Sequence, residues 1–511
     1  MGARRNALAI GGQMPVAIIG AGFGGLSMAK RLEDRGIEYV IFERSDELGG
    51  TWRDNTYPGC KCDVQSALYS FSFDLNPNWS HTFPEQQEIF AYMKAAAVKI
   101  GALDRIRFGD PLRSASWDST SGMWDLVTES GRYSAGSLVL AVGPLSEPRL
   151  PEVQGSNRFD GTIFHSARWD HEVDLVGRKV AVVGSGASAI QFVPRIQPLV
   201  SELYLLQRTP PWILPHLDRP LKAWERTALK YFPPLRSIMR LYYYLQRELL
   251  VLAFIKDPAR MSAAKKMALS HLTSQVSDPE LVRQLTPEYE PGCKRLLLSN
   301  DYYPSIQQSN VQLIPHALTG FTDRGVVYQD DKGSEVEIEV DTVIFATGFK
   351  VTDHPVFSTI VGRTGKSLSQ YWAKTGMVAY CGTTVPEFPN LFILAGPNTG
   401  IGHTSLVTMI EGQVRYVAGA LDLMLENGGV PLEVRQDVFE AYNAEVQQKM
   451  KSTVWTTGGC GSWYLDSEGR NTTLWPDFTF RFLKRTRRFD AESYQVVPRS
   501  GKHLQGVKIG Q

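Results

Sequence analysis

The chain contains one local pattern twice: an apolar strand, a Gly-rich turn, a helical stretch and a second apolar strand. The first copy spans residues 16–43 and the second spans residues 180–208. This pattern is typical of a βαβ unit in which the turn and the helix N-terminus bring backbone N–H groups to a pyrophosphate. Two copies in one chain therefore predict two dinucleotide-binding sites.

The first turn, residues 20–25, predicts a site for FAD or NAD rather than NADP. Gly20 allows the tight turn, Gly22 lets the backbone approach a pyrophosphate, and Gly25 lets helix and strand pack closely. Glu43 follows 23 residues after Gly20, where its carboxylate can accept hydrogen bonds from ribose hydroxyls and would repel a 2′-phosphate. A structural glycine turn is the alternative, but the strand, helix and acid at this spacing favour a dinucleotide.

The second turn, residues 184–189, is followed by a cation instead of an acid. Arg208 lies 24 residues after the first glycine, and a guanidinium there can bind a 2′-phosphate through charge-assisted, bidentate hydrogen bonds. A solvated surface arginine is the alternative. The two sites together imply electron flow from NADPH to FAD. The predicted NADPH-binding residues here are Gly184, Ser185, Gly186, Ser188, Ala189, Gln191, Arg208 and Thr209.

The two units predict an α/β fold with two Rossmann-like dinucleotide-binding domains, each with three layers around a central parallel sheet, and a helical insertion. A strand pattern ends at Val142-Gly143-Pro144, a break suited to a hinge. Pro233-Pro234 interrupts the glycine-poor insertion and predicts a break between helices there. The expected boundaries are 14–145 and 385–511 for the FAD-binding domain, 146–215 and 291–384 for the NADP-binding domain, and 216–290 for the helical subdomain.

Charge and cysteine content exclude several classes of protein. The 511 residues include 54 basic and 53 acidic ones, whereas a nucleic-acid-binding protein usually has a basic excess. Five cysteines, an odd and sparse set, predict no disulfide framework and fit a reducing compartment. Residues 1–13 have no signal-peptide pattern, and no apolar run approaches the roughly 18 residues of a membrane span. We therefore expect a cytoplasmic protein without stable membrane insertion and without a metal site.

Two longer motifs narrow the class of enzyme. The pattern FxGxxxHxxxW(P/D) is matched by Phe159, Gly161, His165, Trp169 and Asp170, and GxWxxxxYPGxxxD is matched by Gly50, Trp52, Tyr57, Pro58, Gly59 and Asp63. With these motifs the chain resembles the Baeyer–Villiger monooxygenases over most of its length. The resemblance implies that the protein uses NADPH and O₂ to insert one oxygen atom beside a ketone carbonyl, giving an ester or lactone through a peroxyflavin.

The same resemblance implies roles for individual residues in catalysis. Arg295 would stabilise the anionic peroxide and the developing oxyanion over the flavin. Asp63 would hold the Arg295 guanidinium in place as a carboxylate partner. Lys294 would join Arg208 and Thr209 near the 2′-phosphate. The alternatives are two adjacent surface cations and, for Asp63, a helix cap.

The remaining expected cofactor contacts also come from the resemblance. Residues 391–398 would reach the isoalloxazine ring, and Trp463 would contact NADP from a mobile loop, with a plain buried aromatic as the alternative. His165 is expected to be a conformational latch in a linker rather than a proton-transfer group. The further residues predicted to bind a cofactor are Thr51, Trp52, Asp63, Val64, Tyr69, Lys294, Arg295 and Asn398.

Three other functions are considered beside this one. An S- or N-oxygenating flavin monooxygenase would carry another aromatic residue in place of Trp169 and would not need Arg295 as an anion stabiliser. A disulfide reductase would carry a redox cysteine pair soon after the first turn, whereas Cys60 and Cys62 have a different spacing. A non-oxygenating flavoprotein, acting as a sensor or scaffold, would consume NADPH independently of ketone.

Residues 226–255 combine tyrosines, leucines and interspersed cations. One interpretation is a buried helical subdomain. The other is an amphipathic surface that admits apolar substrates or touches a membrane peripherally.

Overall fold

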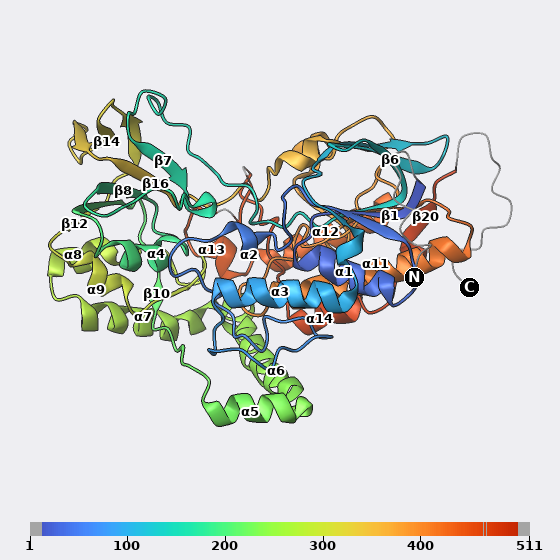
Figure 1. Ribbon diagram of the computed structural model, residues 1–511, viewed down its shortest axis with the longest axis horizontal. Coiled ribbons are helices and arrows are strands. Elements are labelled where there is room, and N and C mark those ends of the chain that lie inside the picture. The colour runs from blue at the N-terminus through green and yellow to red at the C-terminus, as the bar shows by residue number, and fades with distance from the viewer. Residues whose placement is uncertain (1–12, 463, 467, 499–511) are drawn as a thin grey trace.

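The structure is a computed structural model that describes residues 13–462, 464–466 and 468–498. Two lobes lie side by side, and a helical part projects below them (Figure 1). The first lobe, on the right in Figure 1, contains the first glycine-rich turn, and the second lobe, on the left, contains the second turn. This arrangement confirms the predicted α/β class with two Rossmann-like units and a helical insertion.

The first lobe is built on an eight-stranded sheet in the order β17-β4-β5-β6-β1-β2-β3, with β18 also paired to β6. Strands β18, β6, β1, β2 and β3 are parallel, but β4, β5 and β6 form an antiparallel meander. The predicted central parallel sheet is therefore present, and an antiparallel meander extends it, because turns as short as those between β4, β5 and β6 can only join antiparallel strands. The strands are β1 (Gln13–Ile19), β2 (Tyr39–Phe42), β3 (Ile106–Arg107), β4 (Leu112–Asp118), β5 (Met123–Thr128), β6 (Arg132–Leu140), β17 (Ile360–Val361) and β18 (Leu391–Ile393).

Helices bury the central strands of this lobe, which explains why β1 and β2 read as continuous apolar runs. Helix α1 packs against both α3 and α11, and the three lie together beside the sheet (Figure 1). A short antiparallel pair, β19 (Leu432–Val434) and β20 (Tyr494–Val496), lies outside the main sheet. The helices of this lobe are α1 (Phe23–Glu33), α2 (Thr51–Asp54), α3 (Gln86–Ile100), α10 (Leu368–Thr375), α11 (Leu406–Glu426), α12 (Gln436–Met450), α13 (Val454–Thr457) and α14 (Thr479–Arg485).

The second lobe has three layers around a parallel sheet in the order β12-β9-β8-β16-β7. Helices α4 (Ala189–Ile196) and α9 (Tyr302–Ile306) pack together as one layer. A three-stranded antiparallel sheet shares an apolar cluster with the parallel sheet and forms the other layer. The strands are β7 (Thr162–His165), β8 (Lys179–Val183), β9 (Glu202–Leu206), β12 (Val311–Ile314), β13 (Leu318–Phe321), β14 (Gly325–Gln329), β15 (Glu335–Glu339) and β16 (Thr342–Phe345).

The insertion is helical, and its proline pair separates two helices as predicted. Helix α5 (Ala223–Tyr231) ends before the pair, and α6 (Pro233–Glu248) begins on it. Proline is suited to the first turn of a helix, where its missing N–H leaves no hydrogen bond unmade. Helices α7 (Met261–Gln275) and α8 (Pro279–Leu285) follow, and the small parallel pair β10 (Ile213–Leu214) and β11 (Leu297–Leu298) brackets the insertion.

Two chain segments cross between the lobes side by side. The first follows β6, which ends at Leu140, just before the predicted Gly/Pro break. The second follows β16, and the two are joined by hydrogen bonds from Arg149 N to Gly348 O (2.9 Å) and from Lys350 N to Glu147 O (2.8 Å). Because β17 pairs with β4, the chain has rejoined the first sheet by Ile360. The predicted boundary at 384–385 is therefore too late: β17 has only two residues, too few to give a strand pattern in the sequence.

The described helices include none that is both long enough and apolar enough to cross a lipid bilayer.

Candidate active site

The first glycine-rich turn is packed so closely that two of its positions have no room for a side chain. A Cβ on Gly20, whose φ is +103°, would lie 2.7 Å from the Ala141 carbonyl oxygen. A Cβ on Gly25 would lie 2.0 Å from the Gly20 carbonyl oxygen. Both distances are below van der Waals contact, so the turn holds the N-terminus of α1 directly against the end of β1 as the sequence predicts.

Open space lies above the middle glycine of this turn. A Cβ on Gly22 would meet nothing closer than the Gly50 Cα, 3.9 Å away. Facing it, the Thr51 hydroxyl donates to the Leu145 carbonyl (3.3 Å), and the Trp52 indole donates to the Tyr69 hydroxyl (2.9 Å). The exposed backbone of the turn and this facing wall form a cradle that fits the pyrophosphate of a dinucleotide.

Glu43 lies immediately after β2 and is buried beside the turn. Its carboxylate accepts hydrogen bonds from the Ala21 backbone N–H (2.8 Å), the Ser45 backbone N–H (3.1 Å) and the Arg53 guanidinium (2.9 Å). The predicted acid is therefore fixed next to the cradle, where it disfavours a 2′-phosphate. Arg53 of α2, which no motif in the sequence marks, follows the cradle wall and holds Glu43 in this position.

The two kinds of glycine in the turn give a matched test. We expect Gly25→Ala to yield insoluble or unfolded protein, because its methyl would overlap a backbone oxygen that cannot move. We expect Gly22→Ala to fold normally but to lose bound flavin, because its methyl only fills the cradle. Circular dichroism and flavin absorbance after purification separate the outcomes. A Gly22→Ala protein with full flavin content would contradict the assignment of the cradle.

The second turn repeats this geometry. A Cβ on Gly184, whose φ is +106°, would lie 2.6 Å from the Ala346 carbonyl oxygen, whereas a Cβ on Gly186 would meet no atom within 4 Å. The Ser185 hydroxyl donates to the Thr209 carbonyl (3.3 Å) and ties the turn to the segment after β9. Ser188 and Ala189 begin α4. The turn again presents open backbone at a helix N-terminus, which fits a second dinucleotide.

Two cations lie near this turn without a carboxylate partner. Arg208 is exposed two residues after the end of β9, and among the described residues neither it nor Lys294 forms an ion pair. The Lys294 ammonium lies 5.0 Å from the centre of the Tyr289 ring. Burial, and then the positive charge of Arg208, lower the pKa of Lys294 below its usual value. Like charges gathered in this way fit the 2′-phosphate of NADPH and would not fit a ribose hydroxyl.

Arg295 and Asp63 form the predicted ion pair. The Arg295 Nε donates to Oδ2 of Asp63 at 2.5 Å, and Nη2 donates to Oδ1 at 2.6 Å. Burial raises the pKa of Asp63, but Arg295 and then Arg247 outweigh it and hold that pKa below its usual value. Asp63 in turn raises the pKa of Arg295. The bidentate geometry fixes the plane of the guanidinium, and Asp63 does not cap a helix.

Two further residues complete this cluster and were not assigned a role from the sequence. Arg247 reaches in from α6 and donates to the Asp63 backbone carbonyl (2.9 Å) and to the Gln65 side chain (2.9 Å). Tyr464 is buried near the pair. Burial raises the pKa of Tyr464 to about 12, and the charges of Arg295 and Asp63 act on it in opposite directions, Arg295 lowering it and Asp63 raising it. Neither lies within a motif, and no signal in the sequence marks them, because each comes from an element distant along the chain.

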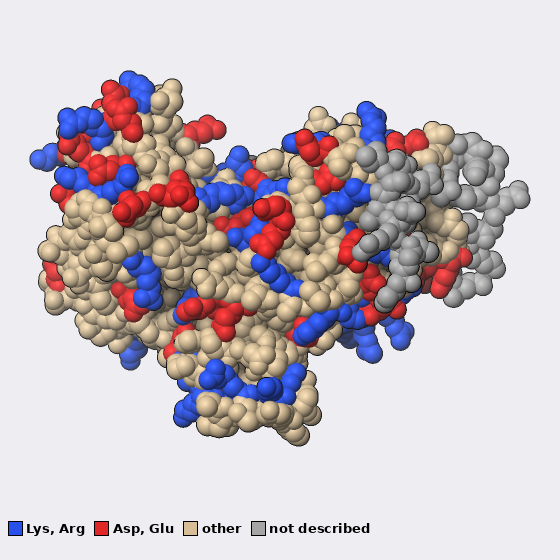
Figure 2. Space-filling view, in the orientation of Figure 1, with Lys and Arg blue, Asp and Glu red and all other residues tan. Residues whose placement is uncertain are grey.

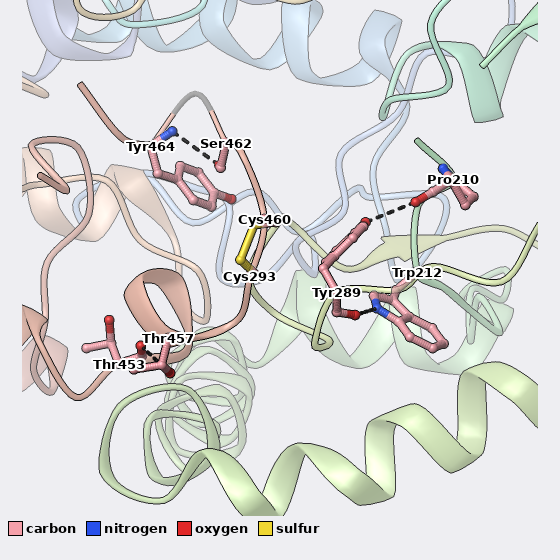
Figure 3. Close-up of a disulfide and its surroundings, with 9 residues drawn as sticks. All are labelled: Pro210, Trp212, Tyr289, Cys293, Thr453, Thr457, Cys460, Ser462 and Tyr464. Atoms are coloured by element: carbon pink, nitrogen blue, oxygen red, sulfur yellow. Dashed lines mark hydrogen bonds between the residues drawn. A yellow bond between two sulfur atoms is a disulfide. The ribbon is translucent and has the colours of Figure 1, made fainter. Parts of the chain in front are cut away.

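One disulfide lies beside the Arg295–Asp63 pair, although the sparse cysteines fitted a reducing compartment and predicted no disulfide framework. Cys293, directly before Lys294 and Arg295, is bonded to Cys460 across 167 residues of sequence (Figure 3). The Glu290 backbone N–H also donates to the Gly458 carbonyl (2.9 Å). The segment with the two cations is thus held to the segment that leads to Tyr464. The predicted NADP-contacting Trp463 lies outside the described residues.

The other three cysteines, Cys60, Cys62 and Cys381, are buried and unbonded. Burial raises the pKa of Cys60 to about 12 and also raises the pKa of Cys62, so both remain neutral thiols. A neutral thiol is neither a redox nucleophile nor a metal ligand, which argues against a disulfide reductase. Within the described part of the chain, no group of three or more potential ligands is arranged to hold a metal ion.

The segment 159–170 lies where the two lobes meet. Arg168 pairs with Asp54 of the first lobe (3.2 Å) and donates to the Ser146 carbonyl (3.1 Å). Trp169 packs against Phe192 of α4, with ring centres 5.2 Å apart. At Gly161 a Cβ would lie 2.4 Å from the Phe159 ring, so this glycine is needed for packing. Thr162–His165 is strand β7 of the second sheet, so the segment reaches the first lobe only after this strand, and a linker role remains a prediction.

His165 is buried at the end of β7. Its Nδ1 accepts a hydrogen bond from the Ala167 backbone N–H (3.0 Å), and its ring lies 6.0 Å from the ring of Phe349, in the second crossing segment. Burial, and then Arg168, lower the pKa of His165 to about 4. The imidazole is therefore neutral at physiological pH and lies beside the lobe crossing, and a latch role remains a prediction. Asp170, at the end of the motif, accepts the Glu172 backbone N–H (3.0 Å).

Three other predicted cofactor-binding side chains are occupied by protein contacts. The Asn398 amide is fully buried and donates to the carbonyls of Asn471 (3.0 Å) and Leu474 (2.9 Å). Gln191 accepts from the Tyr57 hydroxyl (3.0 Å) and donates to the Lys61 carbonyl (3.1 Å), so it joins α4 to the first lobe. Val64 is buried next to Asp63. For these residues a contact with the cofactor remains a prediction.

Comparison with known proteins agrees with this geometry. The profile of the flavin-binding monooxygenase-like family matches residues 13–372. A Baeyer-Villiger monooxygenase of Streptomyces coelicolor is 44% identical over 484 residues, 94% of this chain and 92% of that protein. One from Pseudomonas aeruginosa is 46% identical over 485 residues, 94% and 91% of the two chains. The chain belongs to the Baeyer–Villiger monooxygenases.

Solved structures place this Baeyer–Villiger monooxygenase among enzymes of the same architecture. Cyclohexanone monooxygenase from Rhodococcus sp. Phi1 bound to NADP+ matches with a TM-score of 0.83 and 26% identity, over 95% of this chain and 99% of that one. An oxidised steroid monooxygenase bound to NADP matches with a TM-score of 0.81 and 27% identity, over 95% and 99% of the chains. The likeness spans both lobes and the insertion, so the predicted family is confirmed.

Proposed function

We propose that this Baeyer–Villiger monooxygenase uses FAD, NADPH and O₂ to insert one oxygen atom beside the carbonyl of a small-molecule ketone, giving an ester or lactone. The observation that carries the proposal is the bidentate Arg295–Asp63 pair, which lies in a chain with two nucleotide cradles of opposite charge. The cradle beside Glu43 would hold FAD, and the one beside Arg208 and Lys294 would hold NADPH. When bound, FAD and NADPH supply oxygen activation and hydride.

The protein's own contribution is positive charge in a fixed orientation. Arg295 presents a permanent cation, because Asp63 raises its pKa further. Oxygen insertion into a ketone develops negative charge on oxygen, and a preorganised donor stabilises that charge without reorganisation. Asp63 orients Arg295, and Arg247 holds the Asp63 backbone in turn. The buried Tyr464 lies close to the pair, and the disulfide holds the segment that carries Arg295 to the segment that leads to Tyr464.

Sulfur or nitrogen oxygenation is the second candidate function. It needs an electrophilic oxygen donor and no anion stabiliser, so it would leave the Arg295–Asp63 pair without a role. The Trp169-Asp170 ending of the linker motif also favours ketone oxidation. A sulfide offered as substrate should therefore be converted independently of Arg295.

Product analysis tests the proposal directly. The purified enzyme is incubated with NADPH and a panel of cyclic, linear and bulky ketones under ¹⁸O₂, and products are identified by mass spectrometry. We expect one ¹⁸O atom per ester or lactone, and NADPH consumption that rises when ketone is added. NADPH consumption that yields only hydrogen peroxide with every ketone would indicate a non-oxygenating flavoprotein instead.

A further inference from the structure

Helix α6 is amphipathic, but its apolar face is turned to solvent instead of to the protein core. Five of its outward positions, spaced as one face of a helix, are Ile238, Leu241, Tyr242, Leu245 and, at its C-terminal cap, Leu249. Their exposed fractions range from 54% to 65%. A surface helix of a globular protein normally buries such a stripe. An exposed apolar face of this size therefore indicates a surface that binds something outside this chain.

The opposite face of α6 carries arginines that are hydrogen-bonded to α5 and to the first lobe, so the helix cannot rotate to bury its apolar side. Arg236 donates to the last carbonyls of α5, at Leu229 (2.7 Å) and Lys230 (3.0 Å). Arg240 donates to the Ser70 carbonyl (2.7 Å). Arg247 donates to the backbone carbonyl of Asp63, a residue of the candidate active site. Each arginine hydrogen-bonds at least one partly buried backbone carbonyl, which would be costly to leave without a partner.

Helix α5 extends the same surface. Ten of the twenty large hydrophobic side chains that are exposed among the described residues lie between positions 217 and 250. Trp224 and Tyr231 of α5 are exposed by 66% and 75%. The two helices project from the rest of the molecule at the bottom of Figure 1. The apolar members of this surface, called the α5–α6 patch, are Leu217, Trp224, Tyr231, Phe232, Ile238, Leu241, Tyr242, Leu245, Leu249 and Leu250.

Three exposed cations accompany the patch. Lys222, Arg226 and Lys230 form no ion pair with any described residue. The acid on the same helix, Glu225, is already bonded to the Arg219 guanidinium (2.7 and 2.8 Å). Figure 2 accordingly shows Lys and Arg between uncharged side chains on the projecting part. The surface is therefore apolar, rich in aromatic residues and positively charged.

We propose that the α5–α6 patch docks on anionic phospholipid membranes. Trp and Tyr favour the headgroup level of a bilayer, leucines enter the acyl boundary, and Lys and Arg attract anionic headgroups. A second copy of the chain fits less well, because a two-fold contact across the patch would bring its cations against their own copies. Since α6 runs from the patch to the Asp63 carbonyl, docking would place the site close to apolar ketones dissolved in the membrane.

Vesicle flotation of the holoenzyme tests this docking. We expect the protein to float with vesicles of phosphatidylcholine and phosphatidylglycerol, and to float less at high salt or with phosphatidylcholine alone. Each cation near an anionic surface strengthens binding roughly fivefold, so K222Q/R226Q/K230Q should bind about a hundredfold more weakly. L241Q/L245Q/L249Q should fail to float. The matched control V98Q/V176Q/L425Q removes three exposed apolar side chains elsewhere and should float like the unchanged enzyme.

Two further measurements make the test decisive. All three variants should oxidise a water-soluble ketone at the unchanged rate, which shows that they are folded. Light scattering after size exclusion reports the oligomeric state. Three results would each overturn the proposal. The unchanged enzyme could fail to float, the patch and control variants could float equally, or the enzyme could be a dimer that only the patch variants dissociate.

Discussion

Replacing Arg295 by alanine should lower the rate of ester formation by roughly 10²–10³-fold while NADPH oxidation continues. The guanidinium is the cation that Asp63 fixes by two hydrogen bonds, and its removal leaves the developing negative charge on oxygen without a preorganised donor. The NADPH cradle lies at the second turn, around Gly184 and Arg208, and does not require Arg295. We therefore expect each NADPH oxidised to reduce one O₂ to hydrogen peroxide instead of giving one ester, as measured by a peroxide assay beside gas chromatography.

Two companion variants show whether position and charge both matter. Arg295→Lys keeps the charge but cannot form the bidentate contact, so it should recover only part of the lost rate. Arg283→Ala removes an arginine of α8 that is 72% exposed, and it should behave like the unchanged enzyme. Normal ester formation by Arg295→Ala would show that another group supplies the positive charge.

The local parts of this structure could be predicted from the sequence. Gly20, Gly25 and Gly184 lie where a Cβ would overlap a backbone oxygen. Because this steric requirement acts within a single turn, it is visible in the sequence as a short motif. The acid and the cation that follow the two turns are likewise set by the length of one βαβ unit. A glycine-poor composition and a proline pair were sufficient to predict a helical insertion and the break between its helices.

The parts that depend on distant contacts could not be predicted. The disulfide joins cysteines 167 residues apart, and no spacing rule pairs them. Arg247 appeared in the sequence as one of several cations on a helical stretch, and only the fold shows that it reaches Asp63. The exposed face of α6 was ambiguous for the same reason, because the sequence shows an amphipathic helix but not which face is turned inward. The resemblance to a family supplied Arg295, for which spacing alone gave no reason.

Removing the cations at the second turn should abolish the preference for NADPH over NADH. A hydrogen bond to a charged group is worth about 1.5–3 kcal/mol, so Arg208→Ala and Lys294→Ala should each raise the KM for NADPH roughly 10- to 150-fold. The KM for NADH and the kcat with either cofactor should change little, because NADH lacks the 2′-phosphate. Steady-state kinetics with both cofactors measure the effect, and Arg324→Ala, which removes a 75% exposed arginine of the same lobe, is the control.

The double variant should lose less than the sum of the two single effects. Arg208 lowers the pKa of Lys294, so the two cations destabilise each other until an anion lies between them. A 2′-phosphate carries close to two negative charges at neutral pH and relieves that repulsion as it binds. Removing one cation therefore also relieves the other, and neighbouring charges of this kind are not additive. If both single variants weaken NADH and NADPH equally, the cations serve the fold of the turn and not the phosphate.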